Sequence, residues 1–370
     1  MTLPSLSASR RSHYALAFNF AASQLHHLIT TCPDAFPMYT VNGKWALGAE
    51  SWTNWCEGFL GGQLWLLHRH TQDTTWRTHA EHYSRLIEPR KTDRNVHDLG
   101  FLFWSTWKRW LDVEDTLAQQ AVLIEAGQTM GLRFKEKGQY LRSFLAEDSL
   151  FIDIMMNVGI VFYAAQQTGD TRLEDIARQH CLTTRRYLVR GDGSTAHEGI
   201  FDLTTGEFLR QSTQQGWRSD SCWARGLAWA LYGFGTVYAL SGDARFLDTA
   251  ERCAGYYIQH SPAHGVPSND YDEPNPALPY ESSAAAISAS GLLQLSRLAP
   301  DALRARLYQD YALNILDTLT TPEFLAIDTP GWEGLLKHGM YHQRKGLGVD
   351  ESVMWGDYFF LEALSKVLDE

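Results

Sequence analysis

The chain of 370 residues lacks the features that mark several large classes of protein. It has five cysteines and no Cys-x-x-Cys pair, which argues against a disulfide framework and favours a reducing, cytoplasmic location. Its 32 Lys and Arg are outnumbered by 43 Asp and Glu, and a net charge of −11 argues against a nucleic-acid partner. No apolar run approaches the roughly 18 residues of a membrane span, so we expect no membrane partner.

Signatures of metal, nucleotide and nucleophile sites are also lacking. The histidines at 68–70 and 79–82 have no third ligand at a convincing spacing. Gly191 and Gly193 do not follow a strand of a βαβ unit, as a dinucleotide-binding loop would. No Ser or Cys lies in a nucleophile-elbow context. We therefore expect no metal and no cofactor.

What the sequence does contain is helical periodicity, and strand alternation is scarce. The pattern predicts twelve helices, near residues 12–31, 55–70, 74–88, 98–111, 115–135, 148–167, 171–188, 220–241, 244–260, 281–298, 301–319 and 350–368. Five connections contain an Asp that ends one apolar-periodic stretch and opens the next, as a helix N-cap does: Asp73, Asp115, Asp170, Asp243 and Asp301.

Twelve helices joined by such turns make six hairpins of unequal length, which does not fit a stack of identical repeats. We predict that they close into an all-α (α/α)6 barrel, a single domain covering residues 1–370. The alternative is an open helical array. Four long non-helical stretches would then gather at the mouth of the ring, and long ordered loops tend to carry function: 32–54, 189–219, 261–280 and 320–349.

Two carboxylates are the first candidates for chemistry. Asp153 lies within the otherwise apolar run LFIDIMMNVGIV, and burial raises the pKa of a carboxyl group, which suits a general acid. Asp98 follows His97 at the start of an apolar helix. The structural alternatives are an Asp153 satisfied by a neighbouring helix and an Asp98 that only serves its helix's first turn. A carboxylate pair is typical of glycosidases, but sequence does not supply the distance between the two.

A third segment, QQGWRSDSCWARGLAWALYGF, places Arg225 between Trp223 and Trp229. An Arg in this position can pair with a carboxylate while the rings hold a pyranose. The alternative is Trp in the core and Arg at the surface. Weaker candidates, each with a structural alternative, are His197 in a Gly-rich loop, Trp55, and Tyr341 with Arg344 and Lys345.

Taken together, these segments resemble the unsaturated glucuronyl hydrolases of glycoside hydrolase family 88, from about residue 52 to 364. The most specific pieces are HDLGF at 97–101, FIDIMMN at 151–157 and Trp-x-Arg-Gly-x-x-Trp at 223–229. Further matches are RRYLVRGDGSTAH at 185–197, YESSAAAISASGLL at 280–293 and MWGDYFFLEAL at 354–364. The resemblance implies an (α/α)6 barrel that acts on lyase-generated oligosaccharides ending in a 4,5-unsaturated uronic acid.

The resemblance also implies the reaction and the roles of individual residues. Asp153 would protonate C4 of the C4=C5 vinyl ether and activate the water that adds at C5, without a metal or a covalent sugar–enzyme bond. Asp98 would help to orient the unsaturated ring. Substrate contacts would come from Trp55, His97, His197, Gln215, Trp223, Arg225, Trp229 and Tyr341. Phe144 stands, by a gapped alignment, where family members can carry a Trp that stacks on the next sugar, so the aglycone preference stays open.

Three alternatives remain open. An unsaturated rhamnogalacturonyl hydrolase acting on pectin fragments typically has Met-Asp-Gly around the acid, whereas this chain has Ile152-Asp153-Ile154. A sugar epimerase would need paired histidines as acid and base, for which His97 and His197 are the candidates. A non-catalytic carbohydrate-binding barrel would have lost the acid. We expect a monomer or a weak homo-oligomer.

The tryptophans are distributed unevenly. Eight of the 13 lie at or before Trp110, none lies between 111 and 216, and five follow. Uniform core filling would not leave such a gap, so we interpret part of the excess as a sugar-binding mouth formed by Trp55, Trp223 and Trp229.

Overall fold

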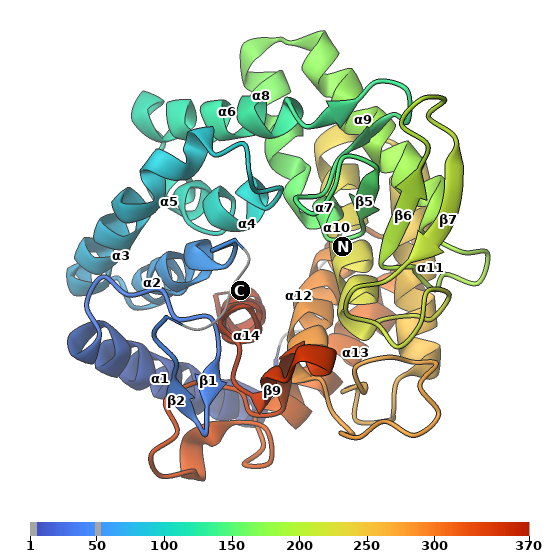
Figure 1. Ribbon diagram of the computed structural model, residues 1–370. Coiled ribbons are helices and arrows are strands. Elements are labelled where there is room, and N and C mark those ends of the chain that lie inside the picture. Colours follow the sequence, from blue (N-terminus) through green and yellow to red (C-terminus); the bar gives the residue numbers. More distant parts are fainter. Residues whose placement is uncertain (1–5, 49–52, 370) are drawn as a thin grey trace.

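The computed structural model describes residues 6–48 and 53–369, and most of them are helical (Figure 1). The helices are α1 (Ala8–Thr31), α2 (Glu57–Thr71), α3 (Thr74–Ile87), α4 (Leu99–Phe103), α5 (Trp107–Val113), α6 (Leu117–Gly131), α7 (Ile154–Asn157), α8 (Gly159–Thr168), α9 (Thr171–Tyr187), α10 (Ala224–Ser241), α11 (Ala244–His260), α12 (Ser282–Leu298), α13 (Ala302–Leu319) and α14 (Met354–Leu368).

Six helical segments form a closed inner ring in which each packs against the next (Figure 1). They are α2, α4 with α5, α7 with α8, α10, α12 and α14, which returns to α2. The outer layer consists of α1, α3, α6, α9, α11 and α13. Because the chain alternates between the two layers, it forms six hairpins, and the predicted (α/α)6 barrel is confirmed.

The inner helices are buried on all sides. Every residue is buried from Ala224 to Gly235 in α10 and from Ser282 to Leu293 in α12. A helix that is apolar all round belongs in a core, whereas outer helices such as α11 bury one face only. No helix in the described part of the chain has the length and apolar character needed to cross a membrane.

Four of the five predicted Asp caps are confirmed. Asp73, Asp170, Asp243 and Asp301 each accept a hydrogen bond from a backbone N–H in the first turn of the following helix. The prediction is wrong for Asp115, because α6 begins one residue later, and the side chain of its N-cap residue, Thr116, accepts no backbone N–H.

Two predicted helices are interrupted. The segment predicted at 98–111 is divided into α4 and α5. The segment predicted at 148–167 begins instead with a strand, β5 (Ser149–Phe151), and α7 starts only at Ile154. Asp153 is therefore the N-cap residue of α7 and does not lie inside a helix. A short apolar run has no periodicity that separates a buried strand from a buried helix, and pairing with a distant strand decides the outcome here.

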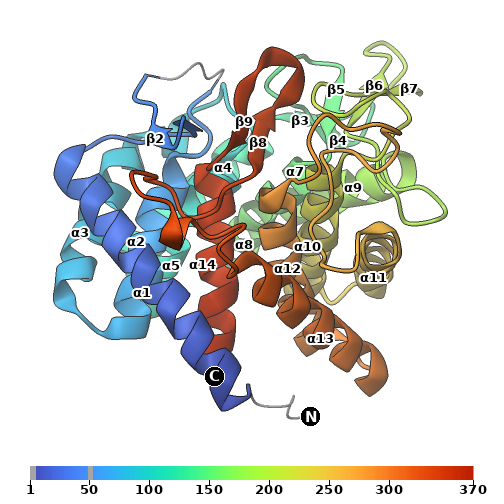
Figure 2. The same ribbon diagram turned by 90° about the horizontal axis from the view of Figure 1, so that it is seen from below.

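The strands lie at one end of the ring, and both chain termini lie toward the other (Figure 2). Antiparallel pairs join β1 (Thr40–Val41) to β2 (Lys44–Trp45), β3 (Phe134–Lys135) to β4 (Tyr140–Leu141), and β8 (Gly339–His342) to β9 (Leu347–Glu351). A three-stranded sheet has the order β5, β6 (Glu198–Phe201), β7 (Phe208–Ser212). The hairpins β1–β2, β6–β7 and β8–β9 belong to long loops that were predicted at the mouth.

Two glycines allow the ring to close around α7. A Cβ atom on Gly100 of α4 would lie 2.4 Å from the Cα of Asn157, and one on Gly233 of α10 would lie 2.5 Å from the carbonyl oxygen of Met155. Both separations are far below van der Waals contact, so a side chain at either position would push α7 away.

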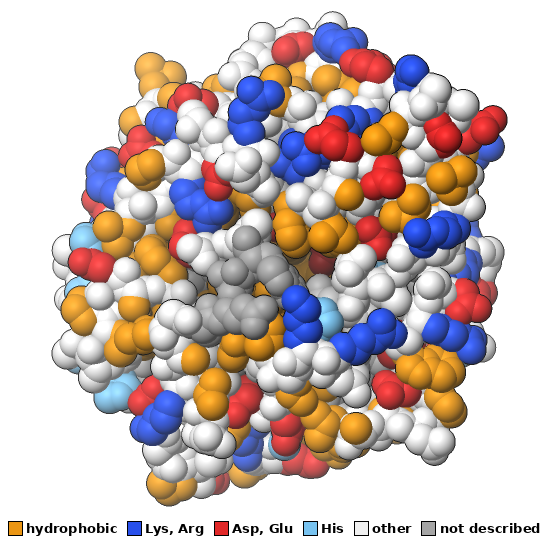
Figure 3. All heavy atoms as spheres, viewed as in Figure 1, with side chains coloured by type: hydrophobic (Ala, Val, Ile, Leu, Met, Phe, Trp, Pro, Cys, Tyr) orange, Lys and Arg blue, Asp and Glu red, His pale blue; other side chains and the backbone are white. Residues whose placement is uncertain are grey.

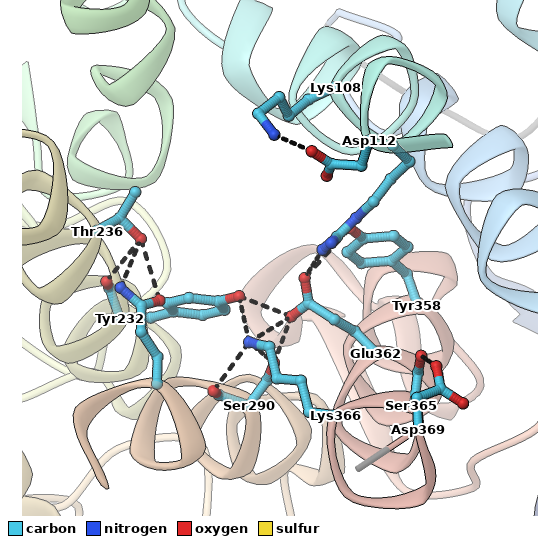
Figure 4. Close-up of polar contacts among 12 residues, drawn as sticks. Lys108, Asp112, Tyr232, Thr236, Ser290, Tyr358, Glu362, Ser365, Lys366 and Asp369 are labelled. Carbon is cyan, nitrogen blue, oxygen red and sulfur yellow. Dashed lines mark hydrogen bonds and ion pairs between the residues drawn. The ribbon is translucent and has the colours of Figure 1, made fainter. Parts of the chain in front are cut away.

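The base of the ring is held by a buried ionic network around Glu362 of α14 (Figure 4). Its carboxylate accepts hydrogen bonds from Arg109, Ser290 and Tyr232, and Lys366 lies 3.4 Å away. Burial by itself raises the pKa of Glu362, but the charges of Lys366 and Arg109 lower it to about 2. The ionised carboxylate therefore ties together α5, α10, α12 and α14.

We predict that Glu362→Gln lowers the free energy of unfolding by about 3–5 kcal/mol, because Arg109 and Lys366 would remain as buried cations without their anion. Urea denaturation measures the change. The matched control is Asp112→Asn in the more exposed Lys108–Asp112 pair of the same region (Figure 4), which we expect to cost at most about 1 kcal/mol. Equal losses in the two variants would contradict the prediction.

Candidate functional site

A cavity of about 790 Å³, counted with its open mouth, lies at the strand-bearing end of the ring. Its lining residues are Thr53, Trp55, His97, Asp98, Phe101, Phe144, Leu145, Phe151, Asp153, Gln214, Gln215, Arg225, Tyr341, His342 and Lys345. In Figure 3 this face has hydrophobic side chains beside basic and histidine side chains around its centre. The size and the mixed lining are typical of small-molecule sites.

Asp153 lies where β5 ends and α7 begins. The antiparallel pairing of β5 with β6 sets Phe151 opposite Glu198, and the Ile152 N–H donates to the carbonyl of His197 at 2.9 Å. The side chain of Asp153 is only 14% exposed. Burial raises its pKa to about 6, and the negative charge of Asp98 acts in the same direction. The carboxyl group can therefore hold or release a proton near neutral pH.

Asp98 is the N-cap residue of α4 and borders the same cavity. Its Oδ1 lies 3.1 Å from His97 Nε2 and accepts from Asn157 Nδ2 at 3.4 Å. Asn157 also donates to the carbonyl of Asp153 at 3.1 Å and accepts from the Phe101 N–H at 2.7 Å. This one side chain therefore joins the segments that carry the two aspartates.

The hydrogen bonds of His97 determine which of its ring nitrogens carries the proton. The backbone N–H of Phe144 donates to His97 Nδ1 at 2.8 Å. A backbone N–H can only donate a hydrogen bond, so Nδ1 must be the unprotonated acceptor. In the neutral ring the hydrogen is then on Nε2. His97 is thus a neutral imidazole whose Nε2–H points at Asp98.

His197 is fixed in the same way. The backbone N–H groups of Gln214 and Gln215 lie 3.2 Å and 3.3 Å from its Nδ1 and donate to it. Burial, and to a smaller extent the nearby charge of Arg225, lowers the pKa of His197 to about 3. The proton of this neutral ring is on Nε2, which lies 3.5 Å from Asp153 Oδ2 without forming a hydrogen bond to it.

Arg225, in the first turn of α10, provides a buried positive charge in the cavity wall. It is 1% exposed, and its guanidinium lies 4.4 Å from the Trp223 ring centre and 5.2 Å from that of Trp355. It donates to Gln215 Oε1 and to the carbonyls of Met340 and Tyr341. These contacts fix the guanidinium before any ligand binds.

The structure brings most of the predicted site residues to one cavity: Trp55, His97, Asp98, Phe144, Asp153, Gln215, Arg225 and Tyr341. His197 lies directly behind Asp153. Trp223 and Trp229 are 1% and 0% exposed and do not border the cavity. The first packs on Arg225 and His197, and the second packs on Phe101 and Phe359. Because neighbouring side chains cover both faces of each indole, Trp223 and Trp229 support the cavity wall from behind and do not line it.

Several lining residues were not predicted. Phe101 and Phe151 lie within the motifs HDLGF and FIDIMMN, so their closeness to Asp98 and Asp153 was the available signal. Leu145, Gln214 and His342 adjoin predicted residues, whereas Thr53 carries no sequence signal. Of the basic pair beside Tyr341, Lys345 borders the cavity, while Arg344 donates to the carbonyl of Trp217.

No family model matches the chain. It is 32% identical over 322 residues to an unsaturated glucuronyl hydrolase of Formosa agariphila, covering 85% of this chain and 80% of that protein. It is 30% identical over 330 residues to an unsaturated chondroitin disaccharide hydrolase of Streptococcus pneumoniae, covering 85% and 82%. The crystal structure of the unsaturated glucuronyl hydrolase of Bacillus sp. GL1 matches with a TM-score of 0.89 at 30% identity, covering 95% of this chain and 96% of that one.

The Formosa relative and the solved Bacillus structure carry the name of the family that the sequence motifs indicated, and the fold of the solved structure matches over nearly its whole length. On this evidence the chain belongs to the unsaturated glucuronyl hydrolases, glycoside hydrolase family 88.

Proposed function

We propose that this enzyme removes the 4,5-unsaturated uronic acid from the non-reducing end of oligosaccharides that a polysaccharide lyase has released. The observation that carries the proposal is Asp153, a largely buried carboxyl group in the cavity with a pKa near 6. The Bacillus relative is described as responsible for the degradation of glycosaminoglycan, and the Streptococcus pneumoniae relative is named for chondroitin disaccharides. Both descriptions favour glycosaminoglycan fragments over pectin fragments as substrates.

In the first step, the protonated Asp153 transfers its proton to C4 of the sugar. The π electrons of the C4=C5 double bond form the new C–H bond, and the positive charge that develops at C5 is shared with the ring oxygen. Asp153 becomes a carboxylate. The step needs a carboxyl group that is protonated before reaction, which the burial of Asp153 provides.

In the second step, a water adds to C5 and gives a proton to the Asp153 carboxylate, which restores the acid. The product is a hemiketal at C5. Its collapse to a ketone opens the ring and leaves a hemiacetal at C1, which releases the aglycone sugar. The net reaction consumes one water and returns Asp153 to its starting state.

The remaining cavity residues suit the binding of an acidic sugar. The fixed positive charge of Arg225 can attract the carboxylate of the uronic acid. Trp55, which is half-buried, and Tyr341 offer aromatic faces with their rings 6.4 Å apart. We assign Phe144 to the side of the aglycone, as a smaller platform than a Trp.

The hydrogen bonding of the two histidines argues against the epimerase alternative. An acid–base pair must accept a proton on one side of the sugar and donate one on the other. In both His97 and His197 the Nδ1 lone pair is already occupied by backbone N–H donors, and Nε2 already carries a hydrogen. Asp153, by contrast, has a pKa of about 6, which suits proton transfer near neutral pH.

We predict that Asp153→Asn lowers kcat by about 10²–10⁴-fold, because the amide cannot donate the proton to C4. The assay follows the ultraviolet absorbance of the conjugated uronic acid, which hydration removes, with an unsaturated chondroitin disaccharide. Asp115→Asn, at the surface beside α6, is the control and should retain the wild-type rate. An unchanged rate in Asp153→Asn would sink the mechanism.

The pH dependence should show a fall in kcat/KM as the pH rises through about 6, because Asp153 must be protonated to act. Asp98→Asn removes a negative charge that raises the pKa of Asp153, so in this variant the fall should move to lower pH. Measuring kcat/KM of the wild type and of Asp98→Asn across a pH series tests both statements. A fall that stays in place, or that moves to higher pH, contradicts the electrostatic coupling of the two aspartates.

His197→Gln and His197→Asn separate the two nitrogens of this histidine. The Gln amide nitrogen reaches the position of Nε2 and can still donate toward Asp153, whereas the shorter Asn amide falls near Nδ1. We expect Gln to retain at least about 10-fold more kcat than Asn, the order of a hydrogen bond to a charged group. Steady-state kinetics measure the ratio. Equal activities, or a more active Asn variant, would be inconsistent with an Nε2–H donor.

A further inference from the structure

Arg133 is a buried cation with no role in the mechanism above. It follows α6 and immediately precedes β3, is 3% exposed, and does not border the cavity. Burial is the main cause that lowers its pKa to about 10, and Arg142 lowers it further, so it stays charged at neutral pH. Burying a charge is costly unless it has strong partners, so its contacts call for an explanation.

The described hydrogen bonds of Arg133 all go to backbone carbonyl groups. Nε donates to Arg142 O at 3.0 Å, Nη1 to Arg94 O at 2.5 Å and Nη2 to Ser143 O at 2.7 Å. A planar guanidinium can reach three acceptors in fixed directions at once, which a lysine ammonium on a flexible stem cannot reproduce.

The three carbonyls belong to two chain segments that meet at His97. Arg94 lies three residues before His97, in the loop that leads to Asp98. Ser143 lies directly before Phe144, whose N–H donates to His97 Nδ1 at 2.8 Å. Arg133 therefore binds both the segment that carries His97 and the segment that supplies its hydrogen-bond donor.

We propose that Arg133 is a positioning residue that clamps these two segments together and so holds His97 in the tautomer whose Nε2–H points at Asp98. Without the clamp, the Phe144 N–H can move away from Nδ1 of His97, and the tautomer with its hydrogen on Nδ1 becomes accessible. That tautomer turns the Nε2 lone pair, in place of an N–H, toward Asp98. The consequence for catalysis rests on the proposed function, but the state of His97 does not.

The test uses the full-length chain with Arg133→Met and has two readouts. The ¹⁵N resonances of His97, assigned with a His97→Gln variant, show a single neutral Nε2–H tautomer in the wild type. We expect them to show a mixture of the two neutral tautomers in Arg133→Met. On an unsaturated disaccharide we expect kcat to fall about 10²-fold, the effect of misplacing a catalytic group by about 1 Å, with a smaller change in KM and a shifted pH profile.

Arg252→Met is the matched control. Arg252 also donates to backbone carbonyls, those of Arg190 and Gly191, but it holds a loop away from His97. Both variants should lose stability, and only Arg133→Met should change the His97 resonances and the pH profile. If Arg133→Met does not fold, Arg133→Lys replaces it, because Lys keeps the charge but cannot span three carbonyls.

Three outcomes decide the proposal. A changed His97 tautomer with a shifted pH profile supports it. An unchanged tautomer in the Arg133 variant, with a loss of stability like that of Arg252→Met, overturns it and leaves a purely structural residue. A changed tautomer in a chain whose wild type does not act on unsaturated disaccharides supports the clamp and overturns the proposed function instead.

Discussion

The pairing of β5 with β6 is the interaction on which the site depends. It ends the extended segment at Phe151, places Asp153 at the start of α7, and brings His197 to within 3.5 Å of its carboxyl group. Because β5 follows α6 and β6 follows α9, the pairing joins two separate hairpins of the ring at its mouth. The removal of Asp153 from water, which raises its pKa, is a product of this arrangement.

Backbone amides organise the polar chemistry around the two aspartates. Both histidines receive backbone N–H donors at Nδ1 and present Nε2–H groups toward the carboxyl groups. The imidazoles can therefore donate hydrogen bonds without becoming cations. This leaves the repulsion between Asp98 and Asp153 in place, and that repulsion helps to keep a proton on Asp153.

The two ends of the ring have different functions. At the mouth, the ring segments begin with residues of the site, such as Asp98, Asp153 and Arg225. At the base, the ionic network around Glu362 ties four ring segments together (Figure 4). Separating the groups that stabilise the fold from the groups that perform the reaction allows a buried, costly carboxyl group to persist at the mouth.

The helices follow from the amino-acid sequence alone, because the signals involved are local. Apolar periodicity located all twelve helical segments, and Asp73, Asp170, Asp243 and Asp301 marked helix starts through bonds that span only two or three residues. Motifs of the family were enough to select Asp98 and Asp153, which the fold then brings to one cavity.

Features that depend on contacts between segments far apart in the chain are visible only in the folded molecule. The strand β5 and the tautomer of His97 require partners more than 40 residues away, and the clamp of Arg133 reaches Arg94, 39 residues away. The tautomer of His197 depends on the N–H groups of Gln214 and Gln215, 17 and 18 residues further along the chain. Burial decided the roles of the aromatic residues. Trp55 borders the cavity, whereas Trp223 and Trp229 lie behind its wall. Helix packing covers the indole rings of Trp223 and Trp229 and leaves that of Trp55 accessible. Neither the composition of the sequence nor the spacing of its residues contains that information.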